Sequence, residues 1–355
     1  MKGLDKSSFS RMTEETADSI VQQTGCDNIG LGIILGTGAS RIARLAYDEG
    51  DVKIDYESIR PTIPGTTIEG QKSEIVVLRN RLPGHASIIL FGRRPHTFRL
   101  SSDYENPTPD EIALEVGYIP AVLMHLTRHG RRSGAIITTD AVGGSIHDGR
   151  KGKILKPGDI GIVSGYYTLD RGVHIGQAIG GPFLDRRDIM DEKGISLARR
   201  ASKISGIPTY PGDLYAVHGP DLETSPEYMA FLLMGGIPFV GMTGPEAEVW
   251  YSLKGNIPLR NLHLGIVSDN TLPRPYQLER WLNVALSSHP FRNYMTEVLE
   301  LSRKAEHTRT THEENIKAVN RTTPRIARLL HTYVALLYGI EKAKYSGNSP
   351  LFTYQ

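Results

Sequence analysis

Residues 31–40 read LGIILGTGAS, an apolar run that ends in a glycine-rich turn. Successive apolar residues predict a strand at 31–35 that is covered on both faces of a sheet. The glycines permit a tight turn, and the residues after them have a helical pattern. Such a junction suits an anion, because backbone N–H groups and the positive end of the helix face it. The stretch predicts an α/β fold in which the turn after a core strand either binds an anion or is a plain strand-to-helix turn.

The same alternation of buried strands and helices continues along most of the chain. The stretch 50–110 has several strand candidates and few helices, so the central sheet is expected to be mixed and largely buried, with helices flanking it. No change in composition marks a linker, which favours a single domain over residues 1–355. Further strands are predicted at 74–78, 87–91, 135–138, 160–163, 214–217, 239–242 and 262–267, and helices near 109–129, 194–205, 225–234, 245–254 and 275–344.

Composition excludes several classes of protein. The 41 Lys and Arg residues nearly balance 39 Asp and Glu residues, which argues against a nucleic-acid-binding protein with a strongly basic surface. Cys26 is the one cysteine, so an intramolecular disulfide framework and a Cys-rich zinc site are excluded. No apolar run approaches the roughly 18 residues of a membrane span, and the N-terminus lacks the apolar core of a signal peptide. We expect a cytoplasmic protein that binds neither membranes nor nucleic acid.

Small residues mixed with donors and carboxylates follow most of the predicted strands. Ligands of open α/β sheets bind at the carboxyl ends of the strands, so these clusters are expected to form one composite site. Each cluster alone is equally consistent with an ordinary turn, a solvated loop or a helix cap. The clusters are GRRPHTF (92–98), TTDAVGG (138–144), GPDLETSPE (219–227), GMTGPE (241–246), SDN (268–270) and HEE (312–314).

Taken in chain order, these segments resemble the trimeric purine nucleoside phosphorylase and methylthioadenosine phosphorylase family. The resemblance implies a nucleoside-phosphorylase-like fold and a homotrimer or a multiple of it. It also implies a core at about 28–345, a possible insertion at about 272–300 and a C-terminal helix at about 312–342. The matching blocks are GIILGTGAS (32–40), PGTTIEG (64–70), GRRPHTF (92–98), TTDAVGG (138–144), PGDI (157–160), GPDLETSPE (219–227), VGMTGPEAE (240–248), IVSD (266–269) and THEE (311–314).

The resemblance implies a phosphate pocket but no metal and no cofactor, with inorganic phosphate as a co-substrate. Arg94 keeps the family's Arg-x-His-x-aromatic spacing, whereas Arg93 keeps the Gly-Arg adjacency, so either arginine could hold phosphate. His96 is also carried over as a catalytic residue, together with Glu223 and Asp269. The implied phosphate ligands are Thr37, Arg94, His96, Thr243 and the backbone N–H of Ala141.

The resemblance also implies a nucleoside site in which two branches of the family are combined. Glu223 matches the carboxylate that accepts from the ring N–H groups of a 6-oxopurine. Asp269 matches the methylthioadenosine branch, since the oxopurine enzymes carry Asn there. Leu222 replaces an expected aromatic residue and Gln71 a common histidine. The other implied contacts are Phe98 and Met242 near the ribose, His312 at the ribose 5′-hydroxyl, and Phe183, which is lent to a neighbouring subunit.

The resemblance therefore implies reversible phosphorolysis of purine nucleosides to free base and pentose 1-phosphate. A 5′-methylthioadenosine phosphorylase remains an alternative, which Asp269 supports and which His312 and Glu223 oppose. A non-catalytic purine-nucleoside-binding protein on the same scaffold also remains open. The turn GTGAS alone suggests a dinucleotide-dependent oxidoreductase, but it lacks the third glycine of that fingerprint.

Overall fold

The computed structural model describes residues 6–63, 73–92, 109–128, 134–147, 152–167, 187–217, 223–234, 237–254, 260–284, 292–305 and 311–340. Within them, the large sheet has the strand order β10-β9-β8-β11-β5-β1-β4-β3-β2. Its strands are β1 (Ile29–Ile34), β2 (Val52–Asp55), β3 (Glu74–Leu82), β4 (Ala86–Phe91), β5 (Ala135–Gly144), β8 (Ile160–Tyr167), β9 (Thr209–Ala216), β10 (Phe239–Gly241) and β11 (Arg260–Asn270).

The sheet is mixed, as the sequence predicts. β1 runs parallel to β4 and β5, and β5 runs parallel to β11, whereas β3 is antiparallel to β2 and β4. β10 pairs with the last two residues of β5 as well as with β9. This additional pairing closes β5, β11, β8, β9 and β10 into a barrel-like ring at one end of the sheet. The short strands β6 (Ile146–His147) and β7 (Lys153–Ile154) form a separate hairpin.

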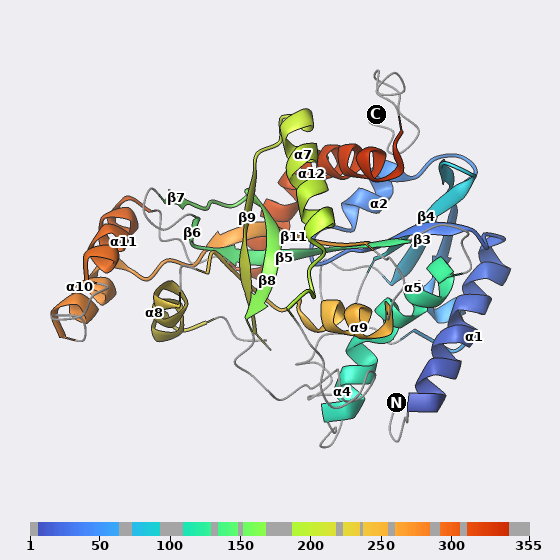
Figure 1. Cartoon of the computed structure of the whole chain (residues 1–355), viewed down its shortest axis with the longest axis horizontal. Coiled ribbons are helices and arrows are strands. Elements are labelled where there is room, and N and C mark those ends of the chain that lie inside the picture. Colours follow the sequence, from blue (N-terminus) through green and yellow to red (C-terminus); the bar gives the residue numbers. More distant parts are fainter. Residues whose placement is uncertain are drawn as a thin grey trace.

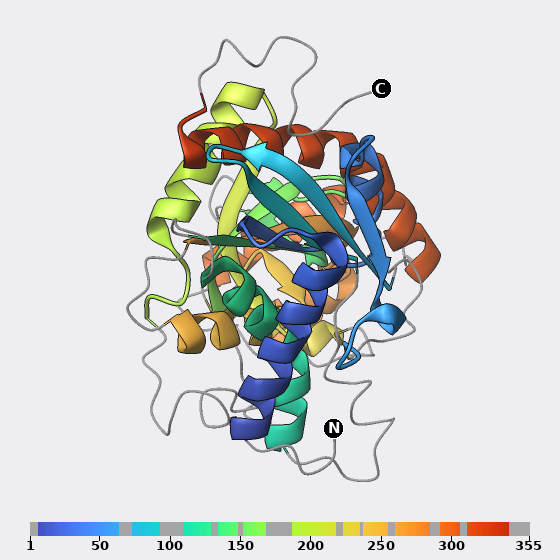
Figure 2. The same cartoon turned by 90° about the vertical axis from the view of Figure 1, so that its right-hand side faces the viewer.

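Helices cover both faces of the sheet. Figure 1 shows α7, α12 and α2 on one side of it and α1, α5 and α9 on the other. In the view of Figure 2, α12 crosses above β3 and β4, while α1 lies below them. The helices are α1 (Lys6–Thr24), α2 (Arg41–Ala46), α4 (Pro109–Val116), α5 (Tyr118–Arg128), α7 (Glu192–Ser205), α8 (Ser225–Leu233), α9 (Pro245–Lys254), α10 (Pro275–Val284), α11 (Arg292–Lys304) and α12 (His312–Tyr338).

Side chains that alternate along each strand pack against opposite faces of the sheet and form the two halves of the core. On β4, Ile88 and Leu90 pack in the cluster with α2, α7 and α12, while Ile89 and Phe91 pack with α1, α5 and α9. All four side chains are fully buried. The continuous apolar runs of the central strands therefore arise because both faces are covered.

Three features differ from the sequence-based expectation. The helix expected near 109–129 is two helices, α4 and α5, that separate at Gly117. The TTDAVGG segment continues β5 to Gly144 and does not form a turn after residue 138, because β11 and β10 pair with it. The N-terminal helix α1 was not among the predicted elements.

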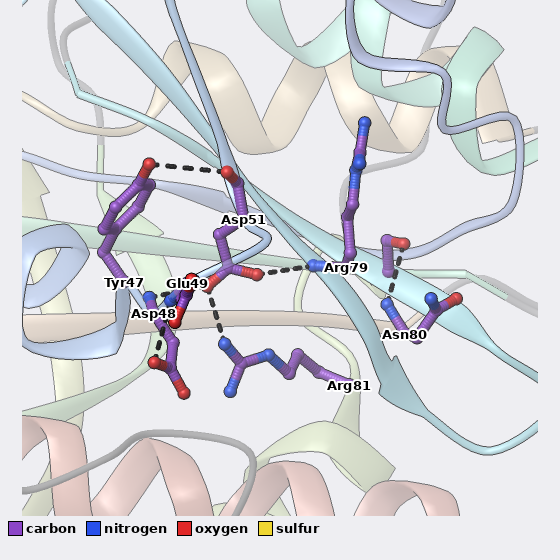
Figure 3. Close-up of polar contacts among 8 residues, drawn as sticks. Tyr47, Asp48, Glu49, Asp51, Arg79, Asn80 and Arg81 are labelled. Carbon is purple, nitrogen blue, oxygen red and sulfur yellow. Dashed lines mark hydrogen bonds and ion pairs between the residues drawn. The ribbon is translucent and has the colours of Figure 1, made fainter.

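An aspartate cluster holds an irregular part of the β3–β4 hairpin (Figure 3). The Asp51 carboxylate accepts from the backbone N–H of Arg79 at 2.9 Å and from the guanidinium of Arg81 at 2.6 Å. The β3–β4 register shifts between Leu78 and Leu82, and Asn80 has a positive φ of 54°. Asp51 thus accepts from one backbone N–H of this irregular segment, that of Arg79, and pairs with the side chain of Arg81, which is a structural role.

The segment expected to be an insertion contains α10 and α11. Their apolar residues pack with one side of α8, through Met229 and Leu232 of α8 and Leu278, Met295 and Val298 of the two helices. Figure 1 shows α8, α10 and α11 together at one end of the molecule. The helix pair therefore supports α8 from outside the sheet. None of the helices described is both long and apolar enough to cross a membrane.

Candidate active site

The glycine turn after β1 lies directly against β5. The backbone N–H of Gly36 donates to the Thr139 hydroxyl at 3.1 Å. A Cβ atom at Gly36 would lie 2.3 Å from the Thr139 carbonyl oxygen and 2.9 Å from the Asp140 Cα. These neighbours are backbone atoms that cannot move aside, so the close approach requires glycine. It brings the next residue, the partly buried Thr37, close to Thr139 and Asp140 in the middle of β5.

The second glycine of the turn contacts the C-terminal helix. Gly38 has a φ of 76°, and a Cβ atom there would lie 2.9 Å from the Cβ atom of Val319 and 3.3 Å from the carbonyl oxygen of Ile316. The first turns of α12 therefore lie beside the Thr37 loop. His312 is the first residue of α12 and is exposed. It lies about 6 Å along the helix axis from Ile316, at 1.5 Å per residue.

Thr243 approaches the same part of β5 from a third direction. It lies between β10 and α9, and its hydroxyl donates to the Asp140 carboxylate; both side chains are buried. Ala141, the next residue of β5, pairs with Ile266 of β11. The structure thus places the turn that carries Thr37, together with Ala141 and Thr243, along the same part of β5, and their role as phosphate ligands stays a prediction. Met242, which precedes Thr243, is partly buried at the same junction.

Two carboxylates lie on the other side of the site. Glu223 immediately precedes the cap of α8, and its Oε2 atom accepts from the Tyr228 hydroxyl at 2.7 Å. Asp269, on β11, pairs with Gly143 of β5 beyond a register shift, and its Oδ1 atom accepts from the Ser268 hydroxyl at 2.8 Å. The two acids are close enough for the charge of Asp269 to act on Glu223. The structure therefore places Glu223 and Asp269 near each other, and their role in binding the base stays a prediction.

Burial changes the proton affinity of this pair. Removal from water raises the pKa of Glu223, and the nearby Asp269 raises it further, while the Tyr228 hydrogen bond opposes the shift. Burial likewise raises the pKa of Asp269, against the hydrogen bond from Ser268. The sequence-based expectation that burial favours a protonated Asp269 has the correct direction. Burial and the Glu223 charge also raise the pKa of Tyr228, which therefore acts as a donor.

The start of α8 is fixed by its own sequence. The backbone N–H of Thr224 donates to the Glu227 carboxylate at 2.6 Å, and the Thr224 hydroxyl donates to the same oxygen at 2.7 Å. This is a capping interaction of the kind that Thr-x-x-Glu predicts, with Pro226 in the first turn. Because Glu223 directly precedes the cap, its backbone position is set by the helix start.

Several predicted site residues lie outside the described residues. They are Arg94, His96, Phe98, Phe183 and Leu222, together with Arg93 and Gln71, and their roles stay predictions.

Two residues with contacts in the site were not predicted to act there. Asp140 was noticed only as part of its motif, and Tyr228 was not singled out. The sequence feature that could have identified Asp140 is a carboxylate within a segment of small residues, next to a predicted anion-binding pocket. For Tyr228, the signal was a tyrosine in the first turns of the helix that Glu223 precedes.

The arrangement suits two neighbouring chemistries. Hydroxyls and a backbone N–H at the glycine turn can bind an oxyanion, whereas buried carboxylates can exchange hydrogen bonds with a polar heterocycle. Among the residues that the structure describes, no group of three or more His, Cys, Asp or Glu side chains is placed to hold a metal ion.

Comparison with known proteins gives a structural match. No protein-family model and no curated protein sequence matches the chain. Isoform 2 of purine nucleoside phosphorylase from Schistosoma mansoni, in complex with cytosine and ribose-1-phosphate, has a TM-score of 0.64 at 19% identity, over 92% of this chain and 96% of its own. The Schistosoma mansoni enzyme with inosine gives 0.64 at 19% identity, over 91% and 95% of the two chains.

The complex of the same enzyme with adenosine gives a TM-score of 0.62 at 18% identity, over 93% of this chain and 97% of its own. The match extends over nearly the whole of both chains and includes the mixed sheet with helices on both faces. The chain therefore has the fold of the purine nucleoside phosphorylases.

Proposed function

We propose that the protein catalyses the reversible phosphorolysis of purine nucleosides to a free purine base and pentose 1-phosphate. One observation carries this proposal. Ala141, a phosphate ligand by sequence resemblance, and Gly143, the pairing partner of Asp269, lie two residues apart on β5. Two residues of a strand span about 7 Å, a separation that a pentose ring can bridge. The solved structures of the same fold, with bound nucleosides, support the substrate class.

One group of residues acts on the phosphate and the sugar, and another acts on the leaving base. Cleavage of the glycosidic bond builds positive charge on the sugar and negative charge on the leaving purine. Phosphate held by Thr37, Thr243, the Ala141 N–H and the predicted Arg94 and His96 stabilises the first charge and attacks the anomeric carbon. Holding both reactants together removes up to roughly 7–11 kcal/mol of the barrier in ideal cases.

The carboxylates serve the leaving base. Glu223 accepts from a ring N–H group of the purine, and Asp269 in its protonated form, or through a water molecule, donates to N7 as negative charge develops there. Burial raises the pKa of Asp269 and so favours the proton that this role needs. No cofactor and no metal takes part in the proposed reaction.

The assembly and location of the protein are part of the same proposal. Sequence resemblance at Phe183 supports a homotrimer, or a multiple of it, in which each subunit lends an aromatic side chain to a neighbour. The single cysteine, which excludes an intramolecular disulfide, supports a reducing, cytoplasmic location.

A 5′-methylthioadenosine phosphorylase is the second candidate, because of Asp269. An ionised aspartate can accept a hydrogen bond from the 6-amino group of an adenine base. A 6-oxopurine has no such group. Glu223 and the resemblance at His312 favour the nucleoside enzyme instead.

A panel of nucleosides tests the proposal. The purified protein is incubated with inosine, guanosine, adenosine or 5′-methylthioadenosine, with and without phosphate, and the free base is measured by chromatography. Release of hypoxanthine or guanine that requires phosphate supports the proposed function. Turnover of 5′-methylthioadenosine alone supports the second candidate. Binding without any release of base would identify a non-catalytic nucleoside-binding protein.

A further inference from the structure

Tyr228 stands apart from the predicted site residues, because it acts on one of them. Its hydroxyl donates to Glu223 Oε2 at 2.7 Å. Its ring packs edge-on against Phe231, with the ring centroids 5.9 Å apart at 89°. Phe231 is buried and in turn contacts Tyr215 of β9 at 3.9 Å between centroids. The phenol is therefore held by the aromatic cluster between α8 and the sheet, and it points its proton at the carboxylate.

We propose that Tyr228 is a specificity-determining positioning residue, whose hydroxyl holds Glu223 as a hydrogen-bond acceptor and so favours purines that present a ring N–H donor. This inference rests on the proposed function. A 6-oxopurine carries a proton on N1, whereas N1 of a 6-aminopurine is an acceptor. A carboxyl group that accepts therefore selects the first, and one that has gained a proton can donate to the second.

The surroundings of Glu223 explain why a fixed donor is needed. Among the described residues, the titratable groups that act on it are Tyr228 and Glu227 of α8 and Asp269 of β11. Both acids raise the pKa of Glu223, as does burial, while its own backbone N–H group lowers it. Without Tyr228, this carboxyl would therefore take up a proton more readily. Tyr228 opposes that, because a hydrogen bond to the charged form stabilises it.

The donor to Asp269 is less firmly committed than the donor to Glu223. Its side-chain donor among the described residues is Ser268, whose hydroxyl lies 2.8 Å from Asp269 Oδ1 and 3.3 Å from the carbonyl oxygen of Val142. One hydroxyl proton cannot serve both acceptors at once. When the two acids share a single proton, the Tyr228 bond thus places it on Asp269, where it can be donated to N7.

The test is the Tyr228→Phe variant, with Tyr215→Phe as the matched control. Tyr215 belongs to the same aromatic cluster and contacts Phe231, so its variant reports the loss of a neighbouring hydroxyl. We expect Tyr228→Phe to lower the inosine-to-adenosine ratio of kcat/KM about tenfold, the effect of one hydrogen bond to a charged group. The acid limb of the inosine pH profile should move to higher pH by about one unit, since Glu223 loses the donor that favours its ionised form.

A double-mutant cycle separates a positioning role from a loss of folding. In a Glu223→Gln background, Tyr228→Phe should leave the nucleoside ratio unchanged, because the carboxylate on which it acts is gone. An unchanged ratio in Tyr228→Phe itself, or an equal change in Tyr215→Phe, overturns the inference while phosphorolysis by the natural protein stands.

Calorimetry with hypoxanthine and adenine in phosphate buffer gives a readout that does not need turnover. Tighter binding of hypoxanthine, reduced by Tyr228→Phe, supports the role of Tyr228 even if the natural protein releases no base and the proposed function fails. Equal binding of the two bases by the natural protein, or no binding of either, contradicts the inference.

Discussion

The Thr243 hydroxyl donates a hydrogen bond to the Asp140 carboxylate, and this buried pair joins residues 103 positions apart in the chain. The bond ties the loop between β10 and α9 to β5, beside the turn that holds Thr37. It therefore couples the shape of the expected phosphate site to the closure of the sheet at this end.

Replacement of Thr243 by valine keeps the side-chain shape and removes the hydroxyl. Asp140 then loses a buried donor, so we expect the free energy of unfolding to fall by about 1–3 kcal/mol. The phosphate KM should rise, because Thr243 is a proposed ligand whose hydroxyl proton turns from Asp140 to the phosphate when phosphate binds. Urea denaturation and steady-state kinetics at saturating nucleoside measure the two effects. Thr243→Ser, which keeps the hydroxyl, should stay near the natural protein; equal behaviour of both variants would count against the role.

Gly36→Ala tests the contact between the glycine turn and β5. The new methyl group meets the backbone of Thr139 and Asp140 at 2.3 and 2.9 Å, so the turn must move away from β5. We expect a loss of about 1–3 kcal/mol in stability and a higher phosphate KM. Gly50→Ala is the control, because a Cβ atom there meets nothing within 4 Å, although its φ of 96° adds some strain. If the phosphate KM of Gly36→Ala were unchanged, the turn would have no role in phosphate binding.

The sequence leaves open whether Arg94 or Arg93 binds phosphate, and alanine variants of the two residues distinguish these possibilities. Because Arg94 keeps the Arg-x-His spacing, Arg94→Ala should raise the phosphate KM strongly, while Arg93→Ala should not. Both variants are measured at saturating nucleoside over a range of phosphate concentrations. The opposite result would assign the clamp to Arg93.

Asp269→Asn tests the choice of base. The amide donates to N7 without needing a proton from solution and accommodates a 6-oxo group, so the adenosine-to-inosine ratio of kcat/KM should fall about tenfold. If the proposed donation to N7 uses a protonated Asp269, activity should fall as pH rises through the raised pKa of this group. The Asn variant should lack that limb. An unchanged nucleoside ratio would refute the specificity role of Asp269.

Met295→Ala tests whether the helix pair α10–α11 supports the base side of the site. Met295 is fully buried among residues of α8, α10 and α11. Truncation should cost about 2–5 kcal/mol of stability and raise the nucleoside KM more than the phosphate KM. Tyr276→Ala on the surface of α10, where the side chain is 62% exposed, should change stability by no more than about 0.5 kcal/mol. Equal rises in both KM values would show a general loss of folding.

The sequence predicts the architecture well because the signals are local. Apolar runs locate the central strands, and the helix expected near 225–234 is α8 (Ser225–Leu233). The extension of β5 to Gly144 was missed, because it depends on pairing with β10 and β11, which lie far along the chain.

Some residues of the site are predicted from the sequence and others are not, because contacts between distant parts of the chain leave no local signal. Resemblance nominates Glu223 and Asp269, and the structure brings them together. The bonds of Thr243 to Asp140 and of Tyr228 to Glu223 depend on side-chain geometry that no spacing rule contains. The positions of Arg94, His96, Phe98, Phe183 and Leu222 fall outside the described residues and stay predictions.

The most direct measurement follows phosphate itself. Inosine and inorganic phosphate are mixed with the protein, and the phosphorus signal is recorded by NMR while hypoxanthine is quantified in the same sample. The expected result is a pentose 1-phosphate signal that grows in equal amount with free hypoxanthine. Release of hypoxanthine with no sugar phosphate, or at the same rate in phosphate-free buffer, would contradict phosphorolysis.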